Sequence, residues 1–401
     1  MKVLLVGSGG REHALAWKLT HSRGLTELHC APGNPGIAKL GHCHPVRAED
    51  AEGLLGLARE LAADLVVVGP EAPLVAGVGD ALRRNGLAVF GPSADAARIE
   101  GSKAFAKDVM RAAGVPTAET LSVARTPCVV KADGLAAGKG VFVCHTQEEL
   151  DHALQAVTAF GGGVVIEELL EGPEVSVFAL CDGVNAIPLP SAQDFKRAYD
   201  GDEGPNTGGM GSYAPGPALD VDEIVETVHR PVLEELARRD SPFVGALYAG
   251  LMLTENGPHV IEFNCRFGDP ETQSLLPLLD GGLLEALAAA AAGDAGDVEL
   301  GSTDDAAVTV VIAGGDYPAN NDVGSPITGI EEAEAAGALV FHAGTALRGD
   351  QLVTSGGRIL DVTATGPTIA AARDLAYDAA SRITFPGARY RTDIAKEAAV
   401  V

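Results

Sequence analysis

The chain has 401 residues, 46% hydrophobic and 21% charged, which is enough for two to four globular domains of roughly 100 to 200 residues. A formal net charge of −26 opposes polyanions over the whole surface and excludes nonspecific nucleic-acid binding. No segment reaches the ~20 apolar residues of a membrane span, and the apolar start is too short for a secretory signal, so we expect a cytoplasmic protein. The six cysteines are scattered without a C-x-x-C pair, which argues against a zinc site or a redox pair.

The first hundred residues alternate short apolar runs with glycine-rich turns and helical stretches. The runs are residues 2–6, 27–30, 64–68 and 87–90, and helices are expected at 12–19 and 51–62. Strands that alternate with helices in this way predict a doubly wound parallel α/β domain over residues 1–99. Its loops gather at one edge of the sheet, where such sheets bind ligands.

The remaining chain predicts two further domains of a different type. Residues 100–304 begin with a helix at 102–107 and carry antiparallel-looking strands, which we interpret as a large α+β domain with a small lobe inserted at about 116–180. Residues 188–217 are predicted to be a long irregular segment, and such segments inside compact domains are usually functional. A helix at 284–292 precedes a last α+β domain at 305–401, with strands at 307–312 and 338–341.

The first glycine turn does not fit a dinucleotide-binding fingerprint. Gly7 and Gly9 are followed by Glu12 where the third glycine belongs, and the second strand ends at Cys30 without the ribose-binding acid. What remains is a strand, a glycine turn and a helix N-terminus, which offers backbone N–H groups to an anion such as a phosphorylated sugar. A plain tight turn would use the same glycines, and the sequence leaves both interpretations open.

A second glycine-rich segment covers residues 131–140. It is not a Walker loop, because three residues separate Gly134 from Gly138, Gly140 replaces the Ser/Thr, and a strand follows. We interpret it as a hairpin that folds over a triphosphate, with Lys131 and Lys139 as phosphate-binding cations. A simple β-hairpin is the alternative, but it would not require two lysines.

Two acidic segments complete the candidate site. Residues 166–174 resemble a hinge whose backbone could contact an adenine edge, with Glu174 accepting bonds from ribose hydroxyls, although acidic turns are common. In residues 260–271, alternation along a strand places Glu262, Asn264 and Arg266 on one face. Two oxygen ligands beside a guanidinium suit Mg²⁺ on ATP phosphates and a cation aimed at the transferred phosphoryl group. A solvent-facing strand edge would alternate similarly.

Together these segments resemble the ATP-grasp enzymes and, within them, the phosphoribosylamine–glycine ligase family. The resemblance extends through nearly the whole chain and includes residues 9–13, 31–34, 68–74, 101–103, 131–140, 204–211, 260–271 and 342–345. It implies the fold described above, with the α/β domain followed by an ATP-grasp core, its inserted lid lobe and a C-terminal α+β domain.

The resemblance also implies where ATP and its metal bind. The residues expected at the phosphates are Lys103, Lys131, Gly134, Gly138, Lys139 and Gly140; those expected at the adenine and ribose are Glu167, Glu168, Leu169 and Glu174. Glu262 and Asn264 are expected to bind Mg²⁺ or Mn²⁺. Many ATP-grasp enzymes have a further acidic ligand on the preceding strand, but residues 251–253 contain none, so water or phosphate would complete the coordination.

For the remaining substrates the resemblance implies two groups of residues. Those expected at 5-phosphoribosylamine are Gly9, Gly10, Arg11, Glu12, Asn34, Pro70 and Glu71, with residues 354–358 closing the site. Those expected at the reaction centre are Asp194, Lys196, Asn206, Thr207, Arg266 and Asp269, of which Arg266 and Asp194, together with Lys131, would be catalytic.

The implied activity is ATP-dependent ligation of glycine to 5-phosphoribosylamine through glycyl phosphate, a step of de novo purine biosynthesis, with residues 134–140 as a closing lid. The partners are then small molecules, with no nucleic acid and no membrane, and a monomer is compatible with the sequence. Two alternatives stay open: another ATP-grasp carboxylate ligase or carboxylase of purine synthesis, and a noncatalytic nucleotide sensor. The joint presence of Lys131, Glu262, Asn264 and Arg266 argues against the sensor.

Overall fold

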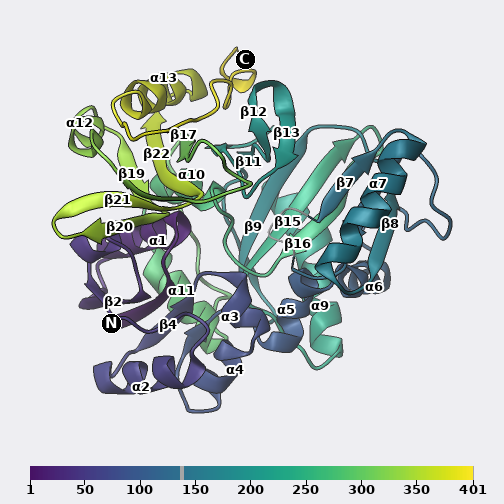
Figure 1. Cartoon of the computed structure of the whole chain (residues 1–401). Helices are drawn as coiled ribbons and strands as arrows, with labels where there is room; N and C mark the ends of the chain where they lie inside the picture. The colour runs from purple at the N-terminus through teal and green to yellow at the C-terminus, as the bar shows by residue number, and fades with distance from the viewer. Residues whose placement is uncertain (136–139, 401) are drawn as a thin grey trace.

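The computed structural model describes residues 1–135 and 140–400. In Figure 1 the N-terminal α/β domain lies at the lower left, the C-terminal region at the upper left, and a small lobe at the right; the long strands β9, β15 and β16 lie between them. Within the described ranges, no helix has the length and hydrophobicity that a bilayer crossing requires.

The N-terminal domain is built on a five-stranded parallel sheet of order β3-β2-β1-β4-β5; the sequence predicted the parallel sheet and four of its strands, but not β3. Its central strands β1 and β4 are buried almost throughout because helices cover both faces of such a sheet. The strands are β1 (Lys2–Gly7), β2 (Glu27–Pro32), β3 (His42–Cys43), β4 (Leu65–Val68) and β5 (Val89–Phe90); the helices are α1 (Gly10–Thr20), α2 (Ala51–Leu61), α3 (Glu71–Val75), α4 (Val78–Arg83) and α5 (Ala94–Gly101).

A four-stranded antiparallel sheet forms the centre of the molecule. Its order is β10-β9-β15-β16, with β9 (Glu174–Asp182), β10 (Ala186–Pro188), β15 (Val244–Thr254) and β16 (Gly257–Asn264). Helices α6 (Lys103–Ala113) and α9 (Arg230–Arg238) share one hydrophobic core with these strands. Since that core also contains residues of β1 and β4, the sheet and the N-terminal domain are packed against each other.

The small lobe has a separate three-stranded sheet and a core of its own. Its order is β7-β6-β8, with β6 (Cys128–Ala132), β7 (Val141–Cys144) and β8 (Val164–Glu168), and helix α7 (Gln147–Val157) packs on it. The lobe was expected to reach residue 180, but β9 pairs with β15 of the central sheet along its whole length. The last strand of the lobe's own sheet therefore ends at Glu168. β9 is buried almost throughout, as expected for a strand of the central sheet.

The prediction of a long irregular segment at residues 188–217 was wrong in part, because short strands joined by turns interrupt it. These residues form four short strands: β11 (Gln193–Asp194), β12 (Arg197–Tyr199), β13 (Glu203–Asn206) and β14 (Gly211–Ala214). β12 and β13 make a hairpin, whereas β11 and β14 extend the C-terminal sheet through the pairing of β14 with β17. Strands of two to four residues rich in glycine and polar residues carry no readable alternation, so the sequence could not reveal them.

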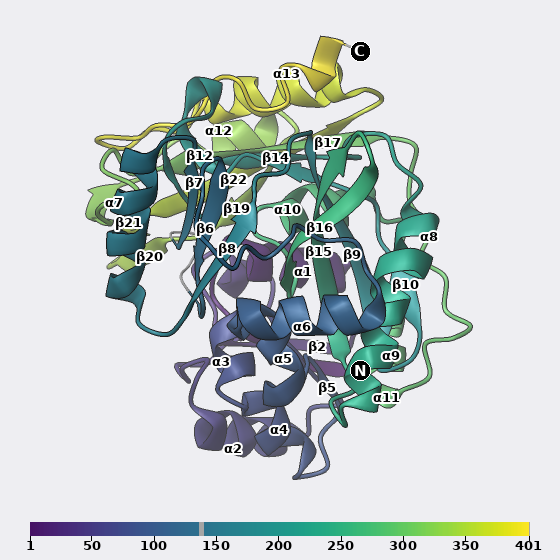
Figure 2. The ribbon, with the colours of Figure 1, turned by 90° about the vertical axis from the view of Figure 1, so that its right-hand side faces the viewer.

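The C-terminal region completes the molecule. Its main sheet has the order β11-β14-β17-β22-β19, and a smaller sheet has the order β18-β21-β20. Figure 2 shows this region above the N-terminal domain, with the lobe at the left. The elements of this region are β17 (Ala306–Ala313), β18 (Asp322–Pro326), α12 (Ile330–Ala335), β19 (Leu339–His342), β20 (Thr345–Arg348), β21 (Gln351–Gly356), β22 (Arg358–Gly366) and α13 (Ile369–Ala380). Three helices precede it in the chain: α8 (Val221–Ile224) and α11 (Leu283–Ala292) pack in the cores that the central sheet shares with the N-terminal domain, and α10 (Glu271–Leu275) packs against β14 and β17.

Candidate functional site

Charged side chains from several elements converge beside the end of β16. Lys196 Nζ, from the connection between β11 and β12, lies 2.7 Å from Glu174 Oε2 and 3.5 Å from Glu262 Oε1. Asp194 is near enough to Lys196, Glu271, Glu174 and Glu262 for their charges to shift its pKa. We call Glu174, Asp194, Lys196, Glu262 and Glu271 the charged cluster.

Within this cluster, the Glu262 carboxylate lies near four cationic side chains. Burial would raise its pKa, but Lys196, Lys131, Lys103 and Arg266 overcome that effect and lower the pKa below the ordinary value. Its partner across the sheet is Gly250, and a Cβ there would lie 3.1 Å from Glu262 Cγ, so the glycine leaves room for this side chain. Glu262 is therefore held as an anion.

Asn264 lies two residues after Glu262 on β16, on the same face of the strand. A carboxylate and an amide oxygen are the hard oxygen donors that Mg²⁺ or Mn²⁺ accepts, so these residues fit such an ion. Among the residues that the structure describes, no three His, Cys, Asp or Glu side chains are arranged as a metal centre.

Asp194 has the opposite titration behaviour. Burial raises the pKa of its carboxyl group, and the negative charges of Glu271, Glu174 and Glu262 add to this, while Lys196 opposes it; the resulting pKa is about 8. A carboxyl group with a pKa near neutrality can take up or release a proton under physiological conditions. Asp194 therefore suits proton transfer beside the anionic Glu262.

Lys131 and Glu167 lie together, although the sequence assigned them to different parts of ATP. Lys131 Nζ lies 2.6 Å from Glu167 Oε2 and donates to the carbonyl of Ile261 at 2.8 Å. The other oxygen of Glu167 is 3.1 Å from Nζ of the buried Lys107. The Glu167 side chain is thus occupied by two lysines, and it does not extend into an open adenine-sized space.

The other residues expected at ATP lie where the lobe connects to the rest of the molecule. Glu168 accepts from the Glu119 N–H at 2.8 Å, and Leu169 follows at the point where β8 ends. Lys103 Nζ donates to the Gly134 carbonyl at 3.0 Å, and the Gly140 carbonyl accepts from the Ala132 N–H at the base of the hairpin. Gly138 and Lys139 lie outside the described residues.

Arg266 follows the end of β16, so the alternation does not continue to it as expected. Its Nη2 lies 3.2 Å from Glu100 Oε1, its Nε 3.3 Å from Glu71 Oε2, and its Nη1 donates to the Phe267 carbonyl at 3.2 Å. Burial disfavours the charged guanidinium, but Glu100 and Glu71 more than offset this and raise the pKa of Arg266. The side chain is nevertheless near enough to Glu262 to stabilise its negative charge.

The glycine turn after β1 is held by buried side chains. Glu12 accepts from the Gly9 N–H at 2.7 Å and so satisfies the backbone donor of the N-cap residue of α1. Arg11 contacts Glu12 and donates to the Phe267 carbonyl at 3.0 Å. A Cβ on Gly10 would lie 1.8 Å from Asp361 Oδ2, so this glycine permits close contact with the C-terminal sheet.

A cavity of about 360 Å³ opens at this turn, between the N-terminal and C-terminal parts of the chain. At its edge, Arg358 Nη2 lies 2.9 Å from Asp269 Oδ2, and Nη1 donates to the carbonyls of Gly208 and Asp269 at 2.5 and 2.9 Å, which leaves at most two of the five guanidinium N–H groups for a ligand. Its lining residues are Ser8, Gly9, Gly33, Asn34, Asp269, Ala343, Gly344, Thr345, Ser355 and Arg358. This cavity joins the predicted turn with residues from the predicted 354–358 segment.

Two residues expected at this substrate have largely structural contacts. The Asn34 amide donates to the carbonyls of Ser8 and His342 and accepts from the Gly36 and Ile37 N–H groups, which uses all its hydrogen-bonding groups. Pro70 precedes the first residue of α3 and places Glu71 there. Glu71 Oε2 lies 3.9 Å from Arg11 Nη1 and 3.3 Å from Arg266 Nε.

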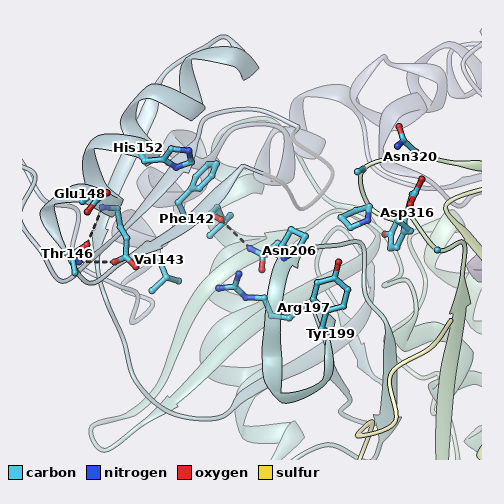
Figure 3. A pocket seen from close by; sticks show the side chains of 17 residues that line it. Phe142, Val143, Thr146, Glu148, His152, Arg197, Tyr199, Asn206, Asp316 and Asn320 are labelled. Atoms are coloured by element: carbon cyan, nitrogen blue, oxygen red, sulfur yellow. Dashed lines mark hydrogen bonds between the residues drawn. The ribbon is translucent and has the colours of Figure 1, made fainter.

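A larger cavity of about 1100 Å³ separates the lobe from the β12–β13 hairpin and residues 315–320 (Figure 3). Phe142 and His152 reach it from the lobe, and Arg197 and Tyr199 from the hairpin. Asn206 also lines this cavity and donates to the Val141 carbonyl at 3.2 Å. This cavity contains none of the charged cluster, so its size does not identify the reaction centre.

Thr207 follows Asn206 in the chain and shapes the loop that carries Lys196. Its hydroxyl donates to the Lys196 carbonyl at 2.8 Å and accepts from the Gly209 N–H at 3.0 Å. Because the side chain is buried, its contribution is to the loop conformation.

Four residues of the site were absent from the predicted set. Arg358 and Glu271 stood inside recognised segments, at 354–358 and 260–271, so their charge was a usable signal. Glu100 and Lys107 lie on helices α5 and α6 without any local motif. Only the packing of those helices brings them to Arg266 and Glu167.

The comparisons with known proteins agree with this arrangement. The chain matches the phosphoribosylglycinamide synthetase N domain over residues 1–100, the ATP-grasp (A) domain over 101–272 and the C domain over 307–397. It is 54% identical to the phosphoribosylamine–glycine ligase of Streptomyces coelicolor, with 100% of both chains covered.

Solved structures give the same result at the level of the fold. The crystal structure of phosphoribosylamine–glycine ligase from Thermotoga maritima matches with a TM-score of 0.86 at 35% identity, covering 98% of this chain and 100% of that one. The biotin carboxylase domain of 2-oxoglutarate carboxylase from Hydrogenobacter thermophilus matches with a TM-score of 0.69 at 19% identity, covering 99% and 97%, which shows a shared fold alone. The chain therefore belongs to the phosphoribosylamine–glycine ligase family, whose central domain has the ATP-grasp fold.

Proposed function

We propose that this chain catalyses the ATP-dependent ligation of glycine to 5-phosphoribosylamine, which yields glycinamide ribonucleotide, ADP and phosphate in de novo purine biosynthesis. The observation that carries the proposal is the match to all three domains of this ligase family along nearly the whole chain. The charged cluster and the cations around Glu262 supply suitable chemistry. A cytoplasmic location and a monomeric state stay predictions.

ATP is proposed to bind between the lobe and the central sheet. Lys103 and Lys131 would contact its phosphates, together with the hairpin at 134–140; Glu168 and Leu169 would lie near the adenine, and Glu174 near the ribose. We revise the role of Glu167, because its carboxylate is paired with Lys131 and Lys107. It would serve as the counterion that holds Lys131 ready for the phosphates.

Glu262 and Asn264 are the residues proposed to hold Mg²⁺ or Mn²⁺. An ion bound there would neutralise phosphate charge and polarise the transferred phosphoryl group. Lys196 pairs with both Glu262 and Glu174 and so restrains their carboxylates. Arg266 would provide positive charge to the phosphoryl group as its negative charge redistributes in the transition state.

The ligation needs an activated carboxylate because oxide is too poor a leaving group. A carboxylate oxygen of glycine would attack the γ-phosphorus, and the bond to the β–γ bridging oxygen would break to release ADP. The sugar amine would then attack the carbonyl carbon of glycyl phosphate, phosphate would leave, and the amine would lose a proton. The ionised form of Asp194 is the candidate acceptor for that proton, because a pKa of about 8 makes it a stronger base than an ordinary carboxylate.

The 360 Å³ cavity is the proposed site for the phosphoribosyl group. Gly9 lies at the N-terminus of α1, where backbone N–H groups and the helix dipole favour an anion. Arg358 would add a cation, while Asp269 holds its guanidinium in position. Glycyl phosphate hydrolyses in water, so closure of residues 134–140 is proposed to exclude solvent.

A coupled assay for ADP tests this function against its rivals. ADP formation should require both glycine and phosphoribosylamine, and omission of either should reduce it to the background rate. Stimulation by bicarbonate instead would indicate a carboxylase, and no ADP with any substrate set would indicate a sensor. Identification of glycinamide ribonucleotide by mass spectrometry completes the test.

A further inference from the structure

We infer that Glu100 is a positioning residue that aims Arg266 at the reaction centre, an inference that rests on the proposed ligase function. Glu100 lies near the end of α5, the last helix of the N-terminal domain, whereas Arg266 follows the last strand of the central sheet. Glu100 Oε1 lies 3.2 Å from Arg266 Nη2. The N-terminal domain thereby holds a guanidinium that acts in the adjoining domain.

The second oxygen of Glu100 fixes the chain from which Arg266 extends. Oε2 accepts from the Cys265 N–H at 2.8 Å, immediately after the end of β16. One carboxylate thus restrains both the backbone before Arg266 and the end of its side chain. Because only 9% of the Glu100 side chain is exposed, water is poorly placed to replace these bonds.

The remaining contacts of Arg266 show what this restraint leaves free. Of the five guanidinium N–H groups, one on Nη2 meets Glu100 and one on Nη1 donates to the Phe267 carbonyl, whereas the buried Nε lies 3.3 Å from Glu71 Oε2 without forming a hydrogen bond. Two N–H groups, one on each terminal nitrogen, are left for a phosphoryl or carboxylate oxygen. Glu71 is more exposed, at 30%, and also faces Arg11, whereas the contacts of Glu100 are with Arg266 and its neighbour Cys265.

Arg266 Nη2 and the Cys265 N–H both donate to the Glu100 carboxylate, so the positioning of Arg266 requires two acceptor oxygens. In Glu100→Gln one oxygen becomes an NH₂ group that meets an N–H donor, and the guanidinium loses half of its paired negative charge. We expect kcat to fall by about tenfold or more, the lower part of the range for a weakened transition-state contact, while KM for ATP changes less than about twofold. Glu100→Asp retains both oxygens on a shorter side chain and should recover part of the lost kcat.

A double-mutant cycle separates positioning from a general structural role. If Glu100 acts through Arg266, Glu100→Gln should lower kcat greatly in the wild-type background and very little in Arg266→Ala. Glu235 provides the matched control, because it is a buried carboxylate paired with Arg238 and Arg239 on α9. Glu235→Gln should lower the thermal midpoint without a comparable loss of kcat, and its effect should be the same in both backgrounds.

The outcomes are distinct. Equal losses of kcat from Glu100→Gln in the two backgrounds, or an unchanged kcat in the wild-type background, would overturn the inference. If Glu100→Gln does not fold, the same cycle is run with Glu100→Asp, and additivity there has the same meaning. Failure of wild-type protein to form ADP with glycine and phosphoribosylamine would instead remove the proposed function itself.

Discussion

Lys131 Nζ lies 2.6 Å from Glu167 Oε2, and this pair connects two strands of the lobe beside the charged cluster. Lys107 contacts the other oxygen of Glu167 and also donates to Thr117 Oγ1 at 2.9 Å, so Glu167 keeps a cationic partner when Lys131 moves. Leaving a buried carboxylate unpaired is costly. With Lys131 on a phosphate, as proposed, Lys107 would still pair with Glu167, so this carboxylate would not be left unpaired.

Lys131→Met should weaken the use of ATP. Removal of one cation from the phosphates is expected to raise KM for ATP about tenfold, the effect of roughly 1.4 kcal/mol in a charge-assisted contact. Initial rates at saturating glycine and phosphoribosylamine measure this. Lys396→Met, an exposed lysine of the C-terminal region, is the control and should leave KM unchanged. An unaltered KM in Lys131→Met would remove Lys131 from the phosphate site.

Arg266→Ala should lose turnover by about 10² or more, the scale for a lost transition-state donor. Its guanidinium is the cation that Glu71 and Glu100 hold near Glu262. Phosphate release dependent on ATP and glycine gives the rate, and Arg382→Ala, in the exposed turn that follows α13, is the matched control. Near-normal release in Arg266→Ala would exclude this residue from the chemistry.

Much of the framework could be predicted from the sequence because its signals are local. The parallel strands of the N-terminal domain are continuous apolar runs, and the Glu262 strand alternates clearly, so both were placed close to their observed bounds. Local patterns also identified the Lys131 hairpin. They could not identify β11 and β14, whose pairing with the C-terminal sheet depends on partners about a hundred residues away.

The site was less predictable because its contacts join distant elements. Glu167 occurs in an acidic segment that resembles a hinge, but its orientation toward Lys107 and Lys131 depends on how α6 packs against the lobe. Arg266 was expected on the face of Glu262, yet β16 ends before it and Glu100 determines its direction. Single-sequence periodicity describes which face a residue occupies within an element, and it says nothing about such long-range partners.

Glu262→Ala should increase the Mg²⁺ concentration needed for half-maximal rate, because Asn264 would be left as the one proposed protein ligand. A tenfold shift corresponds to about 1.4 kcal/mol of binding free energy. Titration of Mg²⁺, and separately of Mn²⁺, at fixed ATP measures the shift, and chelation by EDTA should abolish wild-type activity. Glu255→Gln, in the exposed turn between β15 and β16, serves as control. An unchanged metal requirement would contradict the proposed site.

Arg358→Ala should weaken binding in the 360 Å³ cavity. Ribose 5-phosphate is a suitable probe, and we expect it to raise the thermal midpoint of the wild-type protein but not that of the variant. Arg348→Ala, on the exposed strand β20, should respond like wild type. If Arg358→Ala and wild type show the same thermal shift, Arg358 is not part of the phosphate site. A wild-type protein that does not respond would reject the cavity as the phosphoribosyl site.

His13 makes a testable contribution to the pH dependence of stability. Its Nδ1 accepts from the His342 N–H at 2.7 Å, and burial, followed by His342 and Lys39, lowers its pKa to about 3. The unfolded chain binds a proton at this residue below about pH 6.5, whereas the folded chain does not, so acidification favours unfolding. The contribution is complete above pH 6.5 and is lost progressively as the pH falls toward 3.

His13→Asn isolates this effect from other groups that titrate in the same range. The Asn Oδ1 can replace the Nδ1 acceptor but cannot be protonated, so the variant should lose less stability than wild type between pH 7.5 and pH 5. The expected difference is about 2 kcal/mol at pH 5, from about 1.4 kcal/mol per pH unit below 6.5. Denaturant unfolding at both pH values measures it, with the exposed His145→Asn as control. Parallel losses in wild type and His13→Asn would show that His13 takes up a proton without unfolding.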